Sequence, residues 1–369
     1  MRNVEFWTVR TRFTDLLGID LPIVQAPMAG SNGSALVIAV SEAGALGSLP
    51  CVMLTADLLS AEVEAIRAAT DRPFGLNFFC HQHPVAEPTV VQAWFDRLAP
   101  YFEELDVEPP QAGAGGMARM PFGSEQCALV EELRPPVVSF HFGLPDAGLL
   151  DRIKATGATV LSSATSAGEA VWLAAHGCDV VIAQGVEAGG HRGMFLADDP
   201  AMQMGTMALV PAVVDAVDVP VVAAGGIGDG RGVAAALALG ADGVQMGTAF
   251  LRCPEALTSP VHRTALAAAS GDQTVLTNVV TGRPARSITN RFIREVGPMS
   301  GDAPPFPLAA VGSGLLRAAA EPTGSPEFSP LWSGQAVALG RDVPAGELVR
   351  EVADDAADVL RAAAATMHG

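Results

Sequence analysis

The sequence predicts an α/β protein built as a parallel (β/α)8 or TIM barrel, with a long insertion after the third strand and a mostly helical C-terminal extension. Short apolar runs alternate with longer alanine-rich segments of helical periodicity, as in repeated βα units. Eight such runs occur, which is the number of strands in this barrel. The runs are apolar almost throughout, as expected for a sheet that is covered on both faces.

Each expected element follows from this alternation. The strands are expected, in chain order, at residues 23–27, 45–49, 74–79, 137–142, 159–163, 180–184, 221–224 and 243–247. Between them, helical periodicity is clear at residues 34–43, 56–69, 166–176 and 231–239. Beyond the barrel, two further helices are expected at residues 308–320 and 345–367.

Two places interrupt the rhythm of strands and helices. An insertion of residues 81–136 contains a proline pair and a loose glycine-rich stretch, and a loop of this length in a barrel is typically a flap over the site. After residue 272 the βα pattern ends. We therefore expect a barrel domain at residues 1–272, which includes the insertion, and a helical extension at residues 273–369 that covers the site.

Composition excludes several classes of partner. The net charge of −18 makes nucleic acids and anionic membranes poor partners. The five cysteines are widely spaced and form no CxxC pair, so we expect free thiols in a reducing compartment and no zinc site. No apolar run is long enough to span a bilayer, and the first residues resemble no secretion signal. We expect a cytoplasmic protein and leave open whether it forms a homodimer.

Glycine pairs follow two of the expected strands. Gly225 and Gly226 end the seventh strand, and the eighth ends in Gln245-Met246-Gly247-Thr248. In such a barrel, phosphate groups bind near the last two strands, where main-chain N–H groups can converge on an anion. Taken singly, each glycine has an alternative role in a tight βα turn. Two such ends on adjacent strands favour a phosphate site.

Polar residues also stand at the ends of other strands. Asn77 ends the third strand and Gln184 the sixth; each amide can bind a cofactor, although a hydrogen-bonded core amide is the better interpretation for either alone. Met28 follows the first strand, where it could pack against a flat ring or simply fill the barrel mouth.

His191 lies in the glycine-rich stretch Glu187-Ala188-Gly189-Gly190-His191-Arg192-Gly193, beside the expected phosphate site. A histidine in such a loop has little packing role, and its ordinary pKa suits proton transfer or charge stabilisation near neutrality. We favour a functional role over that of a surface-loop histidine. His141 is a weaker candidate, and His81 and His83 belong to the expected flap. The spacings of these residues resemble no metal site.

Taken as an ordered set, these residues resemble the nitronate monooxygenase family, formerly called 2-nitropropane dioxygenases. Glycine pairs alone are weak evidence, whereas the order of motifs, with Ala188-Gly189-Gly190-His191 among them, is specific for a flavin-dependent branch. The similarity covers almost the whole chain, in segments 22–28, 73–79, 139–143, 161–165, 187–193, 223–227, 245–248 and 329–335.

The resemblance implies an FMN-binding barrel without a metal, in which His191 is catalytic. One branch of the family carries a histidine on the fifth strand, where this chain has Ser162-Ser163, so His191 is the main candidate. The expected cofactor-binding residues are Ala26, Pro27, Met28, Asn77, Gln184, Gly189, Gly190, Gly225, Gly226, Gln245, Met246, Gly247 and Thr248.

Family members oxidise alkyl nitronates with O2 to carbonyl compounds and nitrite. The resemblance therefore implies a nitronate or nitroalkane substrate, and His191 would stabilise the nitronate charge or take the α-proton of a neutral nitroalkane. The alternative is an FMN-dependent enoyl-acyl-carrier-protein reductase that uses NAD(P)H, because such enzymes look similar at the same glycine motifs. A third interpretation is a non-catalytic barrel that senses a phosphate ligand, against which the intact His191 loop argues.

Overall fold

The computed structural model describes residues 10–84, 87–111 and 119–367. Its central sheet has eight parallel strands in the order β1-β9-β8-β6-β5-β4-β3-β2, and a parallel bridge between Val24 and Leu46 joins the two outermost strands into a barrel. The strands are β1 (Ile23–Gln25), β2 (Gly47–Pro50), β3 (Phe74–Phe79), β4 (Val137–His141), β5 (Thr159–Ala164), β6 (Val180–Gln184), β8 (Val221–Ala224) and β9 (Gly243–Met246).

The amino-terminal end of the barrel is plugged by α1 (Arg12–Leu17). Phe13 is fully buried and packs with residues from the beginnings of several strands, among them Val137 and Val180. A Thr11 side chain caps the helix, and Gly18 ends it in the left-handed conformation. Because this end is filled, only the carboxyl ends of the strands can form a site.

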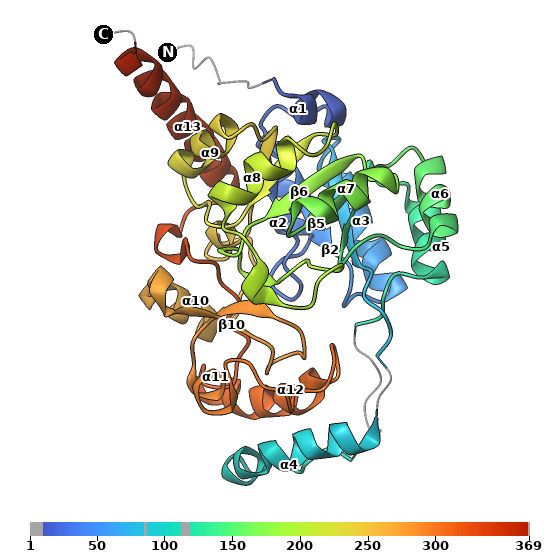
Figure 1. The fold of residues 1–369 in the computed structure, drawn as a ribbon, viewed down its shortest axis with the longest axis vertical. Helices are drawn as coiled ribbons and strands as arrows, with labels where there is room; N and C mark the ends of the chain where they lie inside the picture. The colour runs from blue at the N-terminus through green and yellow to red at the C-terminus, as the bar shows by residue number, and fades with distance from the viewer. Residues whose placement is uncertain (1–9, 85–86, 112–118, 368–369) are drawn as a thin grey trace.

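In the described part of the chain, eight helices surround the strands. The eighth comes from far along the chain and lies beside α9 (Figure 1). The last of them, α13, packs against both α9 and α2 and thereby fills the place between the seventh and the first barrel helix. Its apolar stripe, which includes Leu348, Val352 and Ala356, belongs to the same buried cluster as β9. The helices are α2 (Ser34–Glu42), α3 (Ala56–Ala69), α5 (Ser124–Leu133), α6 (Ala147–Ala155), α7 (Ala167–Ala175), α8 (Thr206–Val214), α9 (Gly230–Ala238) and α13 (Ala345–Met367).

A second layer lies beyond the carboxyl ends of the strands. The antiparallel strands β10 (Thr274–Thr277) and β11 (Ala285–Ile288) pair with each other, and β11 also pairs with the two-residue strand β7 (Gly190–His191). This sheet therefore fastens the histidine loop to the C-terminal segment. Helix α10 (Pro260–Ala268) leads into this segment, which also contains α11 (Arg291–Val296) and α12 (Ala309–Ala320). Its 3-10 turns are Gly271–Gln273, Glu321–Thr323 and Val337–Leu339, and two further 3-10 turns, Pro200–Met202 and Thr248–Phe250, lie in the loops of the barrel.

The insertion after β3 reaches this second layer. Its helix α4 (Pro88–Glu104) lies against α12, well away from the barrel (Figure 1). Trp94 is fully buried and donates to the Ala309 carbonyl oxygen at 3.3 Å, and Leu98 packs into the same aromatic cluster. Two segments that are more than 200 residues apart in the sequence thus share one hydrophobic core.

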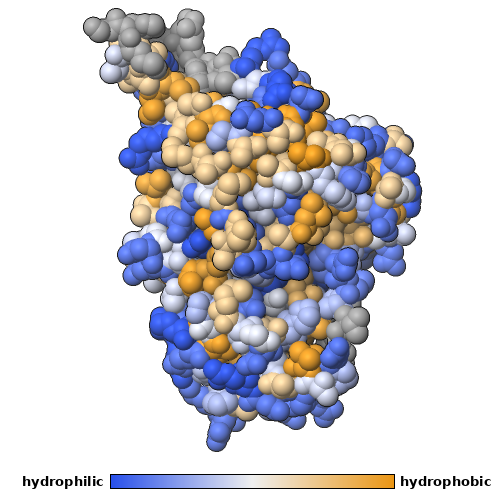
Figure 2. All heavy atoms as spheres, viewed as in Figure 1, coloured by the Kyte–Doolittle hydropathy of each residue, from blue (hydrophilic) through white to orange (hydrophobic). Residues whose placement is uncertain are grey.

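The barrel, its eight strands and the four barrel helices expected from periodicity are confirmed. The C-terminal segment contains two helices close to those expected, but the sequence pattern did not indicate β10 and β11. It also divides in space, since residues 274–339 form the second layer whereas α13 packs on the barrel. In Figure 2, hydrophobic residues gather over the barrel helices, and the region of α11 and α12 is mostly hydrophilic on that face.

Candidate active site

A cavity opens at the carboxyl ends of the barrel strands and brings most of the expected site residues together. His191 lines it, as do twelve of the thirteen expected cofactor-binding residues: Ala26, Pro27, Met28, Asn77, Gln184, Gly189, Gly190, Gly225, Gly226, Gln245, Gly247 and Thr248. Met246 does not line the cavity, because successive side chains of a strand point to opposite faces. Gln245 faces inward, and Met246 is buried in the outer core with a main-chain oxygen that accepts from Ala26 N–H at 2.8 Å.

One end of the cavity is a glycine cradle formed by Gly225, Gly226 and Gly247, where β8 and β9 end. The φ angles of Gly225 and Gly226 are +111° and +71°, which residues with a Cβ rarely adopt. Thr248 Oγ1 accepts from Gly334 N–H at 2.9 Å, so the C-terminal segment forms part of this wall. Main-chain groups exposed without side chains suit a phosphate group.

The histidine loop passes very close to the C-terminal segment. A Cβ on Gly189 would lie 2.5 Å from the Gly334 nitrogen, so only glycine fits there. This close approach holds the two segments against each other beside the cradle. The donor set and the absence of side-chain bulk therefore fit the phosphate end of a mononucleotide.

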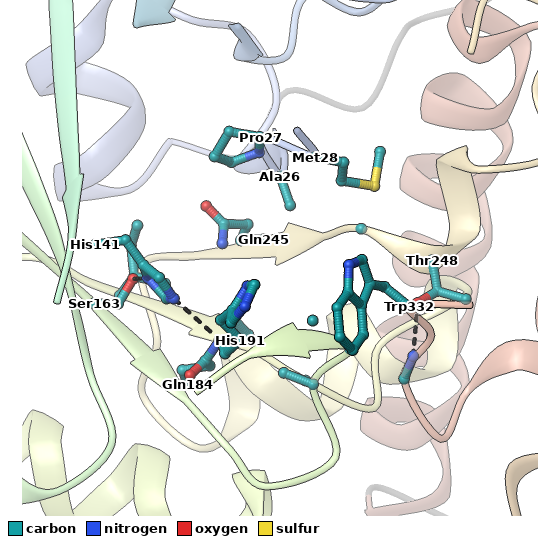
Figure 3. A pocket seen from close by; sticks show the side chains of 18 of the residues that line it. Ala26, Pro27, Met28, His141, Ser163, Gln184, His191, Gln245, Thr248 and Trp332 are labelled. Atoms are coloured by element: carbon teal, nitrogen blue, oxygen red, sulfur yellow. Dashed lines mark hydrogen bonds between the residues drawn. The ribbon is translucent and has the colours of Figure 1, made fainter. Parts of the chain in front are cut away.

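The main chain of His191 is fixed by two side chains from the barrel. Gln184 donates through Nε2 to the His191 carbonyl oxygen at 3.0 Å and accepts through Oε1 from Gly193 N–H at 2.8 Å. His141 Nε2 lies 3.1 Å from the same carbonyl oxygen (Figure 3). A carbonyl oxygen only accepts, so Nε2 of His141 carries the proton, and its Nδ1 accepts from Ser163 Oγ at 3.0 Å. Gln184 and His141 thus position the loop that carries His191.

The imidazole ring of His191 lies among aromatic side chains. Its centroid is 5.2 Å from that of Phe306 and 5.4 Å from that of Trp332, and Figure 3 shows it between His141 and Trp332. Its Nε2 is 2.9 Å from Oγ1 of Thr281, a buried residue that follows β10. The ring is therefore held by a hydroxyl group from the C-terminal segment and has its other edge free for the cavity.

Burial keeps these histidines neutral. Desolvation, with a smaller contribution from Arg119, His141 and Arg283, lowers the pKa of His191 well below its usual value. Desolvation also lowers the pKa of His141 to about 3. Neutral imidazoles can donate and accept hydrogen bonds at neutral pH, but they bring no positive charge to the site.

The flap histidines lie outside the cavity. His81 is buried against Phe306, with ring centroids 4.8 Å apart, and burial lowers its pKa to about 4. His83 is exposed. The part of the expected flap at residues 85–86 and 112–118 lies outside the described residues, and α4 packs on the second layer, away from the cavity mouth.

Several lining residues were not selected from the sequence. Trp332 lies within segment 329–335, whose similarity to the family was the only indication of it. Arg119 and His262 carry no motif, and Thr281, which holds the His191 ring, lies in a stretch without periodicity. Among the described residues, no three His, Cys, Asp or Glu side chains come together in a way that could hold a metal ion. No described helix is long and apolar enough to cross a membrane.

Comparison with known proteins gives consistent results. The family model described as nitronate monooxygenase matches residues 10–355. A curated protein of Pseudomonas aeruginosa, named nitronate monooxygenase, is 42% identical over 345 residues, which is 93% of this chain and 98% of that protein. A curated protein of Paraburkholderia phytofirmans with the same name is 42% identical over 338 residues, 91% of this chain and 92% of that one.

Solved structures show the same architecture. The structure of nitroalkane oxidase from Streptomyces ansochromogenes has a TM-score of 0.87 and 41% identity, and the match covers 95% of this chain and 99% of that one. The structure of FabK from Thermotoga maritima has a TM-score of 0.74 and 32% identity, and it covers 97% of this chain and all of its own.

Proposed function

Because the chain belongs to the nitronate monooxygenase family of flavin-dependent oxidoreductases, we propose that it oxidises alkyl nitronates with O2 to carbonyl compounds and nitrite, with FMN as its flavin. The observation that carries the proposal is that one cavity joins the glycine cradle to the ring of His191. A cradle of this kind suits a phosphate tail, and the histidine stands where the reacting end of a bound mononucleotide would be reached.

The residues of the cavity divide into two groups. Gly225, Gly226, Gly247 and Thr248 would hold the phosphate group of FMN, and Ala26, Met28 and Asn77 would contact its ring system. When bound, the flavin accepts electrons from the substrate and passes them to O2. The protein contributes binding, orientation and shielding from water through the aromatic side chains around His191.

The low pKa of His191 bears on the choice of substrate. A neutral nitroalkane must lose its α-proton to a base, and a base whose pKa is far below neutrality accepts that proton poorly. A nitronate has already lost the proton. His191 is therefore suited to donate a hydrogen bond to a nitronate oxygen, with its ring orientation set by Thr281.

The proposal is tested with the purified protein. We expect a released-cofactor spectrum of FMN and oxygen uptake with ethyl nitronate and propionate 3-nitronate. Replacing His191 by alanine (His191→Ala) should lower kcat/KM at least about 100-fold while the flavin content stays unchanged, because the cradle is separate from the ring.

Other results would contradict this proposal. Rapid bleaching of the flavin by NADH, without nitronate turnover, would identify the reductase alternative. Flavin-free protein that does not take up FMN, or oxygen uptake equal to that of His191→Ala, would exclude the monooxygenase function.

A further inference from the structure

The cavity lining carries positive charge and no negative charge among its described residues. Among the described residues that line the cavity, Arg119 is the cationic side chain, and none is an aspartate or a glutamate. This contrasts with the net charge of −18 of the whole chain. An anion that enters the cavity therefore meets positive charge without local repulsion.

The side chains of Arg119 and His191 both lie near the ring of Phe306. Its guanidinium carbon is 6.0 Å from the centroid of the Phe306 ring, and that centroid is 5.2 Å from the centroid of His191. Its charge has the largest electrostatic effect of any charged group on His191. Arg119 also lines a second cavity, together with Thr281 and residues of α12, so it stands between the reacting ring and an adjoining hollow.

The other buried arginines near His191 are engaged. Arg192 is fully buried and donates to the Gln184 carbonyl oxygen at 2.7 Å and to Gln203 Oε1 at 2.6 Å. Arg283 donates to the Met194 carbonyl oxygen and lies 4.0 Å above the Phe142 ring. Neither lines the cavity. The guanidinium of Arg119, by contrast, forms no hydrogen bond or ion pair with the described part of the chain, and only its main chain contacts His81.

An unpaired guanidinium in a desolvated place is costly unless an anion pairs with it. Burial lowers the pKa of Arg119, which reflects this cost. The neutral His191 offers hydrogen bonding but no charge that could balance an anionic substrate. Among the described lining residues, the cavity thus has one unpaired positive charge, and the nitronate group of the proposed substrate has one negative charge.

We propose that Arg119 binds the negatively charged oxygens of the nitronate group and thereby makes the enzyme select nitronates over the neutral nitroalkanes from which they form. This inference rests on the proposed function. A guanidinium presents paired N–H donors that match the two oxygens of a nitronate, as they match a carboxylate. The same oxygens are spaced alike in nitrite, so inorganic nitrite should bind to the same group.

The test compares two substrates that differ by one proton. Arg119→Met, which keeps length and removes charge, should raise KM for ethyl nitronate roughly 10- to 100-fold, the range for a hydrogen bond to a charged group. The KM for freshly dissolved nitroethane should change less than about twofold. If nitroethane is not turned over, its inhibition constant against ethyl nitronate is measured instead, with the same expectation. Arg119→Lys should recover part of the loss because it restores the charge.

Controls separate this effect from general damage. Arg294→Met removes an exposed charge whose partner is Glu327 at 3.6 Å, and we expect kinetics like those of the unchanged enzyme. Flavin content and thermal unfolding of all variants should agree. The dissociation constant of sodium nitrite, measured from the flavin absorbance, should rise in Arg119→Met and stay unchanged in Arg294→Met.

Two kinds of failure are distinguishable. If the unchanged enzyme oxidises no nitronate, the proposed function fails. If it does, but Arg119→Met leaves KM for ethyl nitronate unchanged, or impairs nitronate and nitroethane alike, the role of Arg119 is overturned and the proposed function stands.

Discussion

The two ends of the cavity are built in different ways. The cradle end consists of main-chain groups at the ends of the adjacent strands β8 and β9, close together in sequence and in space. The reacting end consists of side chains from distant segments, with His191 after β6, Thr281 after β10 and Arg119 in the insertion. In the proposed function, the barrel itself would therefore bind the cofactor, whereas side chains brought in by the loops and the second layer would act on the substrate and select it.

The largest effect is expected from a side chain placed in the cradle. Gly225 has a φ of +111°, and a Cβ would lie 3.0 Å from main-chain atoms of Gly185 and Ala188. Gly225→Val should therefore lower the free energy of unfolding by about 3 kcal/mol and abolish flavin retention. Urea unfolding measures the free energy of unfolding, and the flavin content of the purified protein measures flavin retention. Gly148→Val is the control, because a Cβ there meets no atom within 4 Å. Equal flavin retention in the two variants would contradict the role of the cradle in binding the flavin.

Buried histidines at and around the reacting end should also make stability depend on pH. Burial lowers the pKa of His141 to about 3 and that of His81 and His262 to about 4, so below pH 6.5 the unfolded chain binds protons that the folded chain does not. Stability is then full above pH 6.5 and falls as the pH is lowered, by about 2 kcal/mol for each histidine at pH 5.

Urea unfolding at pH 7 and pH 5 measures this dependence. His262→Gln should reduce the difference between the two pH values by about 2 kcal/mol, whereas the exposed His83 should give no change when replaced by glutamine. If the free energy of unfolding of His262→Gln differs between pH 7 and pH 5 by as much as that of the unchanged protein, then this histidine binds its proton equally well in the folded and unfolded states.

The smallest effect concerns the hydroxyl group that holds the His191 ring. Thr281→Val removes the partner of Nε2 and should lower kcat for ethyl nitronate about fivefold, the value of one neutral hydrogen bond. Flavin content should not change, since Thr281 does not line the cradle. Thr264→Val, on an exposed face of α10, is the matched control. Loss of flavin in Thr281→Val would mean that the two ends of the cavity are coupled.

The sequence predicted what depends on neighbouring residues. Strand positions such as 180–184 and 221–224 follow from short apolar runs, and the cradle follows from paired glycines at their ends. The pattern did not reveal β10 and β11: β10 pairs with β11, and β11 pairs with β7 across about 95 positions of the chain. The sequence also did not predict that Arg119 and Thr281 belong to the site, because only tertiary packing brings them near His191.

The position of α13 has a consequence for how the molecule forms. Because residues 345–357 supply the helix between α9 and α2, the ring of eight units cannot be completed until the ribosome has released this segment. The second layer is thus enclosed between two parts of one barrel and is tethered at both of its ends. Synthesis that stops before residue 345 would leave the apolar faces of α2 and α9 open to aggregation.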